Sequence, residues 1–197
     1  PVDLVGVVGK DYPEAGWRLF ESHNIKTDNI QVVDGKTFRW GGRYNHDFSS
    51  RKTIFTELGV FEFFSPSIQG EDYQYPLVFL GNIQPDLQLD VSRLVTSTKY
   101  IVSDTMNLWI DMSPDKVGEV LAISSVFLLN HEEAFQFTGT NDIPDAANQL
   151  HAAGPDIVVI KMGADGFYVP ERAGRADCFK RREQIIRPYF CHVSSFL

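Results

Sequence analysis

The chain has 197 residues, of which 43% are hydrophobic, and a formal net charge of −8 at pH 7. This length and apolar content suffice for one domain with a sizeable core and exclude a disordered chain. The acidic balance argues against nucleic acid as a partner, because phosphate backbones are bound by concentrated basic surfaces. No apolar run approaches membrane-spanning length, so we expect no membrane partner. Two cysteines, Cys178 and Cys191, leave the main body without a disulfide framework, which favours a reducing, cytoplasmic location.

The first third of the chain predicts two kinds of structure. Residues 2–9 read as a Val-rich strand, residues 13–23 as a helix and residues 30–33 as a second strand, followed by the tight-turn signal Asp34-Gly35. From residue 36 to residue 64, aromatic and β-branched residues alternate with charged ones, as in 37–40 and 61–64. This alternation is typical of antiparallel strands with one solvated face, so we expect a small sheet set apart from the main one.

From Pro76 onward, short apolar runs alternate with segments of helical spacing. The expected strands are 77–80, 100–103, 126–129, 157–160 and 167–169, and the expected helices are 85–94, 113–123, 132–137 and 143–153. Ser113-Pro114 suits a helix start, with Ser as the N-cap residue. Strands and helices that alternate at these lengths imply right-handed crossovers and a mostly parallel sheet flanked by helices. The sequence therefore predicts an α/β fold.

The stretch from Val126 to Thr140 is the most informative. Its apolar run indicates a strand buried on both faces, and it leads directly into Asn130, with Glu133 three positions later at the start of a helix. Polar groups that leave the carboxyl end of a parallel strand face the crevice where open α/β sheets bind ligands. The same spacing also fits a capping box, in which Asn130 and Glu133 only stabilise the helix.

Polar or glycine-rich segments follow three further expected strands. They are Gly81-Asn82, the segment from Asp104 to Asn107, and the segment from Lys161 to Gly166. Together these strand ends favour a binding crevice for a phosphate with a metal ion: carboxylate and amide oxygens suit Mg²⁺, and Lys161 supplies positive charge. Gly163 and Gly166 would let backbone amides approach an anion, although a plain turn into the next strand needs the same residues.

Other chemistries have less support. The sequence contains no Gly-x-x-x-x-Gly-Lys-Ser/Thr, Gly-x-Gly-x-x-Gly, His-Glu-x-x-His or Gly-x-Ser-x-Gly motif. His131 has no second histidine at metal-ligand spacing, so we expect a surface histidine rather than a ligand. Phe61, Phe63 and Phe64 are expected to serve packing.

Several separated segments carry a family resemblance. They are Val-Gly-Val-Val-Gly at 5–9, Asn-Ile-Lys-Thr-Asp-Asn-Ile at 24–30, Leu-Leu-Asn-His-Glu-Glu-Ala at 128–134, Thr-Gly at 138–139, and Val-Val-Ile-Lys-Met-Gly-Ala-Asp-Gly at 158–166. In this order the chain resembles the ribokinase-like (PfkB) carbohydrate kinases over residues 1–169. The resemblance implies a ribokinase-like α/β fold with a small β lid at residues 36–64. It also implies a kinase that transfers the ATP γ-phosphoryl group to a hydroxymethyl group of a small sugar or nucleoside.

The resemblance also implies roles for particular residues. Asn130 and Glu133 match the Asn-x-x-Glu motif that organises Mg²⁺ and phosphate, with Glu133 acting on the metal through water. The residues that match segments lining the nucleotide site are Asp104, Asn107, Lys161, Gly163 and Gly166. Trp40 and Arg43 lie in the expected lid, where they contact substrate or, as the favoured alternative, form a lid or homodimer interface.

The chain departs from the family pattern at both ends. The family begins with a strand that carries a substrate-binding Asp and, a little later, a Gly-Gly pair, and no residues before Pro1 supply them. The sequence also has no Gly-Ala-Gly-Asp motif, which supplies the anion hole and catalytic base in the family. Residues 170–197 do not match the family and are rich in Arg and Lys, which we interpret as a truncation or frameshift. We therefore expect a fold that is incomplete at both ends, in a catalytically incomplete fragment. The alternative is a non-catalytic remnant that binds nucleotide or a protein partner.

Overall fold

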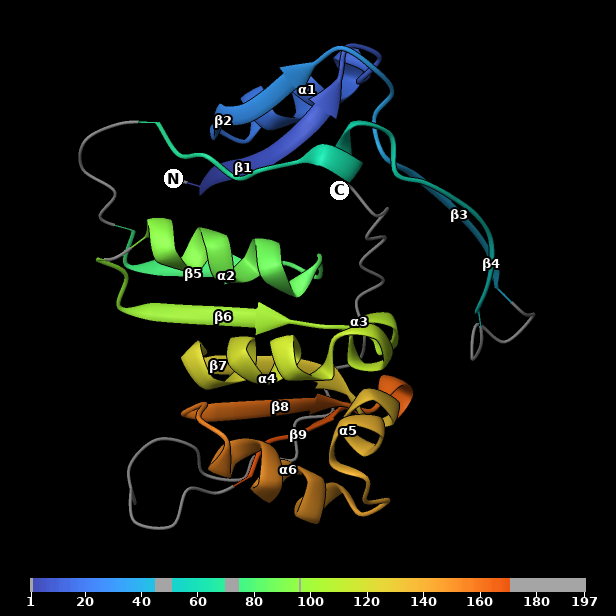
Figure 1. Cartoon of the computed structure of the whole chain (residues 1–197), viewed down its shortest axis with the longest axis vertical. Helices are drawn as coiled ribbons and strands as arrows, with labels where there is room; N and C mark the ends of the chain where they lie inside the picture. Colours follow the sequence, from blue (N-terminus) through green and yellow to red (C-terminus); the bar gives the residue numbers. More distant parts are fainter. Residues whose placement is uncertain (1, 45–50, 70–74, 96, 171–197) are drawn as a thin grey trace. The chain divides into compact units, whose positions relative to one another are not determined.

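The computed structural model describes residues 2–44, 51–69, 75–95 and 97–170, and the chain divides into two compact units (Figure 1). The described part of the first unit lies within residues 2–69, and that of the second within residues 75–170. In these ranges, no helix is long and apolar enough to cross a membrane.

The first unit contains a parallel strand pair and an antiparallel one. β1 (Val2–Gly9) pairs in parallel with β2 (Ile25–Val33), and α1 (Glu14–Ser22) connects them. The helix holds the rings of Trp17 and Phe20 against Tyr12, with centroids 5.1 and 6.2 Å from the tyrosine ring. β3 (Arg39–Tyr44) and β4 (Arg51–Glu57) form the antiparallel pair expected between residues 36 and 64.

Two expectations for this unit were wrong. Residues 61–64 do not form a strand, because η1 (Gly59–Phe63) is a 3-10 helix that begins at a glycine with φ +54°. A Cβ at Gly59 would lie 2.1 Å from the carbonyl oxygen of Lys36, so only glycine fits this turn. Phe63 is 85% exposed and does not serve packing, whereas Phe61 packs between Phe38 and Phe64. At the tight turn expected at Asp34-Gly35 the chain forms a bend, and it then leads to β3, which pairs with β4.

The second unit is built on one sheet. Its strands, in spatial order, are β5 (Leu77–Leu80), β6 (Tyr100–Asp104), β7 (Val126–Asn130), β8 (Ile157–Lys161) and β9 (Phe167–Tyr168). Strands β5 to β8 are parallel and β9 is antiparallel to β8. The connecting elements are α2 (Pro85–Leu94), α3 (Asn107–Met112), α4 (Pro114–Ile123), α5 (His131–Thr138), α6 (Ile143–Ala152) and η2 (Gly163–Asp165). The sequence predicted all of these strands and four of the helices to within a few residues, but missed α3.

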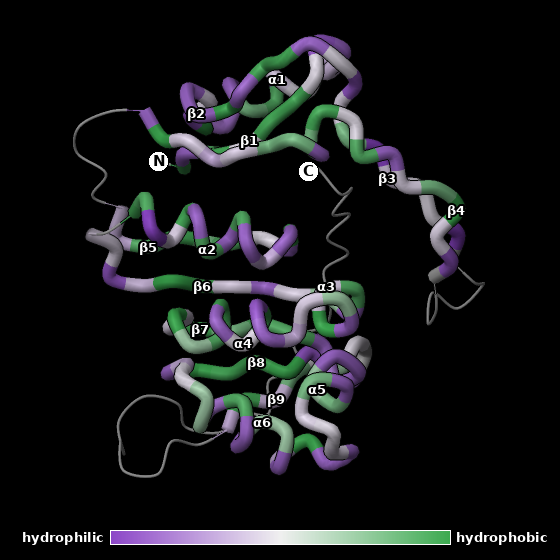
Figure 2. The backbone as a smooth tube through the Cα atoms, viewed as in Figure 1, coloured by the Kyte–Doolittle hydropathy of each residue, from purple (hydrophilic) through white to green (hydrophobic). Residues whose placement is uncertain are grey.

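The core of this unit lies on one face of the sheet. Phe127 and Leu129 of β7 are 1% and 0% exposed and belong to one apolar cluster with residues of α2, α4 and α6, which lie on the same face of the sheet (Figures 1 and 2). Val126 and Leu128 point the other way and are half-buried. The expectation that this strand is buried on both faces was therefore wrong for the described structure, because the described helices cover one face.

Candidate functional site

Polar side chains gather at one edge of the second unit's sheet, where three parallel strands end. Asp104, Asn130 and Lys161 are the last residues of β6, β7 and β8. The register pairs Asp104 with Leu128, and Asn130 with Lys161, so these strand ends lie side by side. This edge is where open α/β sheets bind ligands.

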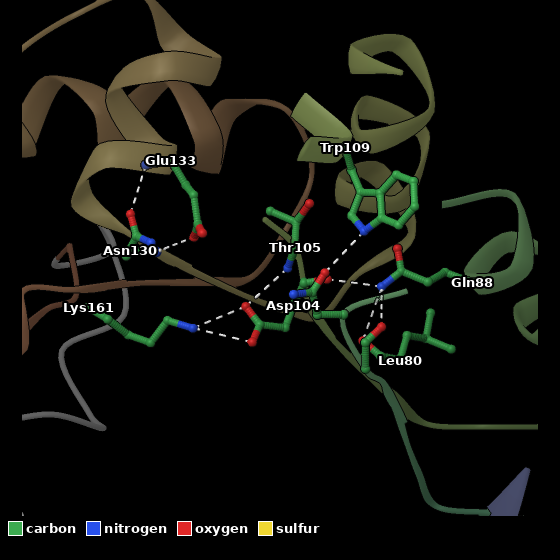
Figure 3. A network of polar contacts seen from close by, with 10 residues as sticks. Leu80, Gln88, Asp104, Thr105, Trp109, Asn130, Glu133 and Lys161 are labelled. Carbon is green, nitrogen blue, oxygen red and sulfur yellow. Dashed lines mark hydrogen bonds and ion pairs between the residues drawn. The ribbon is translucent and has the colours of Figure 1, made fainter. Parts of the chain in front are cut away.

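An ion pair crosses the end of β7 (Figure 3). The Lys161 Nζ atom lies 3.1 and 3.3 Å from the two carboxylate oxygens of Asp104, and the Asp104 Oδ1 atom also accepts a hydrogen bond of 3.0 Å from the Thr105 backbone N–H. The side chains of Lys161 and Asp104 are 46% and 23% exposed. A pair with this exposure contributes at most about 1 kcal/mol to stability, so solvent or a ligand can compete for both charges.

Asn130 and Glu133 form a complete capping box at the start of α5. The Asn130 Oδ1 atom accepts a hydrogen bond of 2.9 Å from the Glu133 backbone N–H, and the Glu133 Oε2 atom accepts one of 2.7 Å from the Asn130 backbone N–H. The capping interpretation of this spacing is therefore confirmed. The residue pair nevertheless lies at the strand-end edge, so capping does not exclude a second role in ligand binding.

Glu133 is a buried carboxyl group, only 5% exposed. Burial raises the pKa of Glu133 above its ordinary value of 4.5, while the hydrogen bond from Asn130 and the charge of Lys161 act in the opposite direction. The negative charge of Asp104 adds to the increase in pKa. A buried carboxylate whose charge is incompletely compensated has a strong preference for a cation, which fits a metal-assisted site.

Gly163 and Gly166 shape the chain after β8. They have φ values of +59° and +91°, and a Cβ at either position would meet no atom within 4 Å. The Met162 N–H donates to the Gly166 carbonyl oxygen at 2.8 Å, which closes a turn into the antiparallel strand β9. The turn interpretation is confirmed, and the open space beside both glycines also leaves room for a ligand.

Asn107 lies at the first position of α3, close in sequence to Asp104 but engaged elsewhere. Its Nδ2 atom donates to the Oε1 atom of Gln136 on α5 at 2.9 Å, and its carbonyl oxygen accepts a hydrogen bond from the Gln136 side chain. A second link joins α3 to the end of β5, because the Trp109 Nε1 atom donates to the Asn82 Oδ1 atom at 3.1 Å. Side-chain hydrogen bonds thus fasten the loops after β5 and β6 to neighbouring helices.

Gln88 is a residue near the site that the sequence did not single out. It is 2% exposed in α2, and its Nε2 atom donates to the carbonyl oxygens of Leu80, Gly81 and Asp104 (Figure 3). The available signal is helical spacing: Gln88 follows Pro85 by three positions and precedes Leu89, so a polar residue occupies the apolar stripe of the helix.

Trp40 and Arg43 lie on β3 in the first unit. The Trp40 Nε1 atom donates to the Thr53 Oγ1 atom of β4 at 3.3 Å, and Arg43 is exposed. A Cβ at Gly42 would lie 2.2 Å from the Trp40 ring, so this glycine makes room for the indole on the surface of the strand pair.

His131 is half-buried and not a surface histidine. Its ring meets Phe135 edge to face, with the centroids 6.0 Å apart, and its buried Nδ1 atom has no hydrogen-bond partner. Within the described ranges, no group of three or more His, Cys, Asp or Glu side chains could hold a metal ion by itself.

Comparisons with known proteins identify relatives of both the sequence and the fold. The sequence pattern of the pfkB family carbohydrate kinases matches residues 80–186. The chain is 28% identical over 171 residues to a cytidine kinase of Thermococcus kodakarensis, an alignment that covers 85% of this chain and 60% of that protein. The chain therefore spans about three fifths of the length of this curated relative.

Two solved structures share the fold at low sequence identity. A putative ribokinase II from E. coli superposes with a TM-score of 0.69 at 14% identity, covering 86% of this chain and 60% of that one. A Methanocaldococcus jannaschii nucleoside kinase, an archaeal member of the ribokinase family, superposes with a TM-score of 0.64 at 15% identity, covering 85% and 55%. The fold is thus ribokinase-like, as the sequence predicted. With more than half of its residues matched by the family pattern, the chain belongs to the pfkB family of carbohydrate kinases.

Proposed function

We propose that this chain supplies the nucleotide site of a cytoplasmic kinase that transfers the γ-phosphoryl group of ATP to a hydroxymethyl group of a nucleoside or sugar. The observation that carries the proposal is the cluster formed by Asp104, Lys161 and the buried Glu133 at the carboxyl edge of a parallel sheet. Phosphoryl transfer is catalysed mainly by positioning and by stabilising negative charge, and this cluster holds the charged groups for both.

The residues present fit a magnesium ion by their chemistry. The carboxylates of Asp104 and Glu133 are the hard oxygen ligands that Mg²⁺ prefers, and phosphate oxygens and water would complete the coordination. When bound, the ion would neutralise charge on the phosphate oxygens. The Lys161 ammonium group would pair with a phosphate oxygen, and Asn130 would keep Glu133 in place through the capping box.

The ion pair between Asp104 and Lys161 predicts how metal and phosphate bind. When phosphate and Mg²⁺ bind together, the Asp104 carboxylate can pair with Mg²⁺ and the Lys161 ammonium group with a phosphate oxygen. Each side chain then keeps a partner of opposite charge although the ion pair between them is broken. ATP without a metal would leave Asp104 without a counterion, so the affinity for ATP should depend on Mg²⁺. In this proposal Gly163 and Gly166 admit the nucleotide beside the backbone, and Asn107 faces the phosphates after releasing Gln136.

A nucleoside is the favoured acceptor. The supporting observation is the detectable sequence identity to a cytidine kinase, in a chain that spans 60% of that relative. We assign the lid to residues 36–64, which include the β3–β4 pair. It would belong to a kinase domain that includes residues 1–169 and extends to residue 186, where the match to the family pattern ends. Trp40 and Arg43 would act from this lid, on the acceptor or in a homodimer contact.

A second function is supported by one feature of the sequence. The 197 residues contain no Gly-Ala-Gly-Asp motif, and the capping box alone accounts for Asn130 and Glu133. The chain could then bind nucleotide or a partner without turnover. Because general acid-base catalysis contributes about 10²- to 10⁴-fold, we expect no measurable phosphoryl transfer from ATP to cytidine by this chain alone. Phosphorylated cytidine in that assay would contradict this expectation and favour a complete catalyst.

Calorimetric titration of the full chain with ATP, with and without Mg²⁺, tests the nucleotide site. The key variant is Glu133→Gln, because a Gln side chain can still accept the Asn130 N–H and so preserves the capping box while removing the charge. We expect the wild-type chain to bind ATP only with Mg²⁺, and the variant to bind it at least about tenfold more weakly, which is 1.4 kcal/mol.

Glu132→Gln is the matched control, because Glu132 loses the same charge from the same helical turn but is exposed. Its affinity should equal that of the wild-type chain. If all three chains bound ATP with Mg²⁺ with equal affinity, the role of Glu133 would be limited to capping α5. Failure of the folded wild-type chain to bind ATP with Mg²⁺ would contradict the nucleotide site itself.

A further inference from the structure

Gln88 is a polar side chain on the face of α2 that is buried against the apolar core. It is 2% exposed, and its neighbour Leu89, at 4%, belongs to the apolar core cluster. An apolar side chain of similar length would fill this position without the free-energy cost of burying an amide. The amide therefore has to be explained by what it binds.

The Gln88 amide nitrogen bridges the ends of two strands. It donates to the carbonyl oxygens of Gly81 at 2.8 Å and Asp104 at 2.9 Å, and makes a longer contact with Leu80 at 3.2 Å (Figure 3). An amide group has two N–H donors. The two shortest bonds use one carbonyl from each strand end, so one side chain joins the chain after β5 to the end of β6.

This bridge begins where the backbone pairing of β5 and β6 stops. The last paired residues of these strands are Leu80 and Ser103. Gly81 and Asp104 are the next residues on each strand, and Gln88 connects their carbonyl groups. On its other side Asp104 still pairs with Leu128 of β7. Gln88 thus replaces the missing sheet contact on the open side of Asp104.

Asp104 is consequently held from two directions. Its backbone carbonyl is fixed from the core side by Gln88, and its carboxylate is fixed at the site by Lys161 and by the Thr105 N–H. The position of the backbone sets where the carboxylate can lie. A displacement of about 1 Å in a site of this kind can reduce function by about 10²-fold.

We infer that Gln88 is a positioning residue, which fixes the Asp104 carboxylate opposite Lys161 by tying the ends of β5 and β6 together. Gln88 acts through the backbone of Asp104 and does not touch the ligand. The inference rests on the proposed nucleotide site for its effect on ligand affinity, but the geometric effect on Asp104 can be measured without any ligand.

The first experiment compares two substitutions in the same helix by calorimetry with ATP and Mg²⁺. Gln88→Met keeps the length and burial of the side chain but removes both donors, and we expect about tenfold weaker binding, or 1.4 kcal/mol. Leu89→Val is the matched control, because it disturbs the adjacent core position and has no hydrogen bond to lose. It should lower the midpoint of thermal unfolding without changing the affinity.

A double-mutant cycle separates positioning from a general structural effect. In an Asp104→Ala background, Gln88→Met should change the affinity for ATP with Mg²⁺ by less than about twofold, because the group that it positions is gone. A tenfold loss that persists in that background would overturn the inference. The inference would also be overturned if Asp104→Ala bound ATP with Mg²⁺ weakly while Gln88→Met bound it with wild-type affinity.

Hydrogen exchange without ligand keeps the inference testable if the proposed function fails. The Thr105 N–H donates to the Asp104 carboxylate, so its exchange rate, measured by NMR, reports whether that carboxylate stays in place. We expect at least about tenfold faster exchange of this one amide in Gln88→Met and no change in Leu89→Val. Unchanged exchange at Thr105 in Gln88→Met would overturn the inference, and absence of ATP binding by the wild-type chain would overturn only the proposed function.

Discussion

Both units of the chain place an aspartate at the carboxyl end of a parallel strand, Asp11 after β1 and Asp104 at the end of β6. Each carboxylate lies near a lysine, Lys36 at 3.6 Å and Lys161 at 3.1 Å, but their other partners differ. In the first unit, Asp11 follows β1 and its Oδ1 atom accepts hydrogen bonds from the N–H and the hydroxyl group of Thr37, at 2.7 and 2.8 Å. The Thr37 hydroxyl oxygen in turn accepts one of 3.0 Å from the Gly9 N–H. In the second unit, Asp104 pairs with the charge of Lys161, and the buried Glu133 lies nearby.

This difference distinguishes a structural hydrogen-bond network, the lock formed by Gly9, Asp11 and Thr37, from a candidate site. The hydrogen bonds from Thr37 lower the pKa of Asp11, because they stabilise its charged form in a network that holds the chain before β3. Burial raises the pKa of Glu133 instead, because its charge is incompletely compensated. The incompletely compensated charge of the buried Glu133 therefore distinguishes the strand-end edge of the second unit from the network around Asp11.

The two units also differ in how they are held together. In the second unit, side chains such as Phe127 and Leu150, both 1% exposed, form one apolar cluster. The first unit buries Val8 to 8%, and Asn29 links β2 by hydrogen bonds to Asp3 at 3.3 Å and to the backbone of Gln69 at 2.7 Å. Apolar packing therefore dominates one unit, and polar links supplement a smaller core in the other.

The largest expected effect comes from the core of the second unit. Phe127→Ala should lower the free energy of unfolding by about 3–5 kcal/mol, because it removes a fully buried ring and leaves a cavity. Val8→Ala, the counterpart in the first unit, should cost only about 1–2 kcal/mol, since it removes two methyl groups from a smaller core. Equilibrium denaturation with urea measures both values. Equal losses would show that the first unit is packed as tightly as the second.

A smaller effect should follow from breaking the lock in the first unit. Thr37→Val keeps the shape of the side chain but removes the hydroxyl group between Gly9 and Asp11, at a cost of about 1 kcal/mol. Stability should fall while the affinity for ATP with Mg²⁺ stays unchanged, as measured by denaturation and calorimetry on the same samples. Weaker nucleotide binding by this variant would contradict the distinction between lock and site.

The subtlest expected effect is a pH dependence of opposite sign in the two units. The raised pKa of Glu133 means that charging it destabilises the folded chain. Glu133→Gln should therefore gain stability relative to the wild-type chain as the pH rises from 4.5, the ordinary pKa of a glutamate, through the raised pKa of Glu133. The two chains should converge in stability below pH 4.5.

Asp11 should behave in the opposite way, because its pKa is lowered from 3.8. Its stabilising contribution is present above that value and is lost as the pH falls through the lowered pKa. Asp11→Asn should thus be less stable than the wild-type chain at neutral pH, with the difference vanishing in acid. Urea denaturation from about pH 2 to about pH 8 gives both curves. Differences of the same sign for the two variants would refute this assignment of charges.

The sequence predicted the features that depend on local pattern. Strand-helix alternation placed β5 to β9 correctly. Because the carboxyl ends of parallel strands lie at one edge of a sheet, the sequence also predicted that Asp104, Asn130 and Lys161 lie at the same edge. Local pattern failed where a tertiary contact decided the conformation. The alternating residues 61–64 became a 3-10 helix because Gly59 turns against the carbonyl group of Lys36.

Contacts between residues that are distant in sequence could not be predicted either, because local pattern does not determine tertiary contacts. Spacing places Gln88 on the buried stripe of α2, but only the packing of α2 against the sheet determines which carbonyl groups it meets. Asp11 and Thr37 are separated by 26 positions, and no local rule joins them. Sequence reasoning also left the capping and metal interpretations of Glu133 open, since one spacing serves both.

The capping box affects which residues are retained when a kinase of this family loses its activity during evolution. Asn130 and Glu133 each accept a backbone N–H of the other, so losing either residue costs folding stability whether or not the chain has a substrate. Purifying selection on folding alone would preserve the pair in a descendant that no longer transfers phosphate. In a lineage that is losing activity, this motif should be among the last of the site's features to disappear, and Lys161, whose exposed ion pair contributes little to stability, among the first.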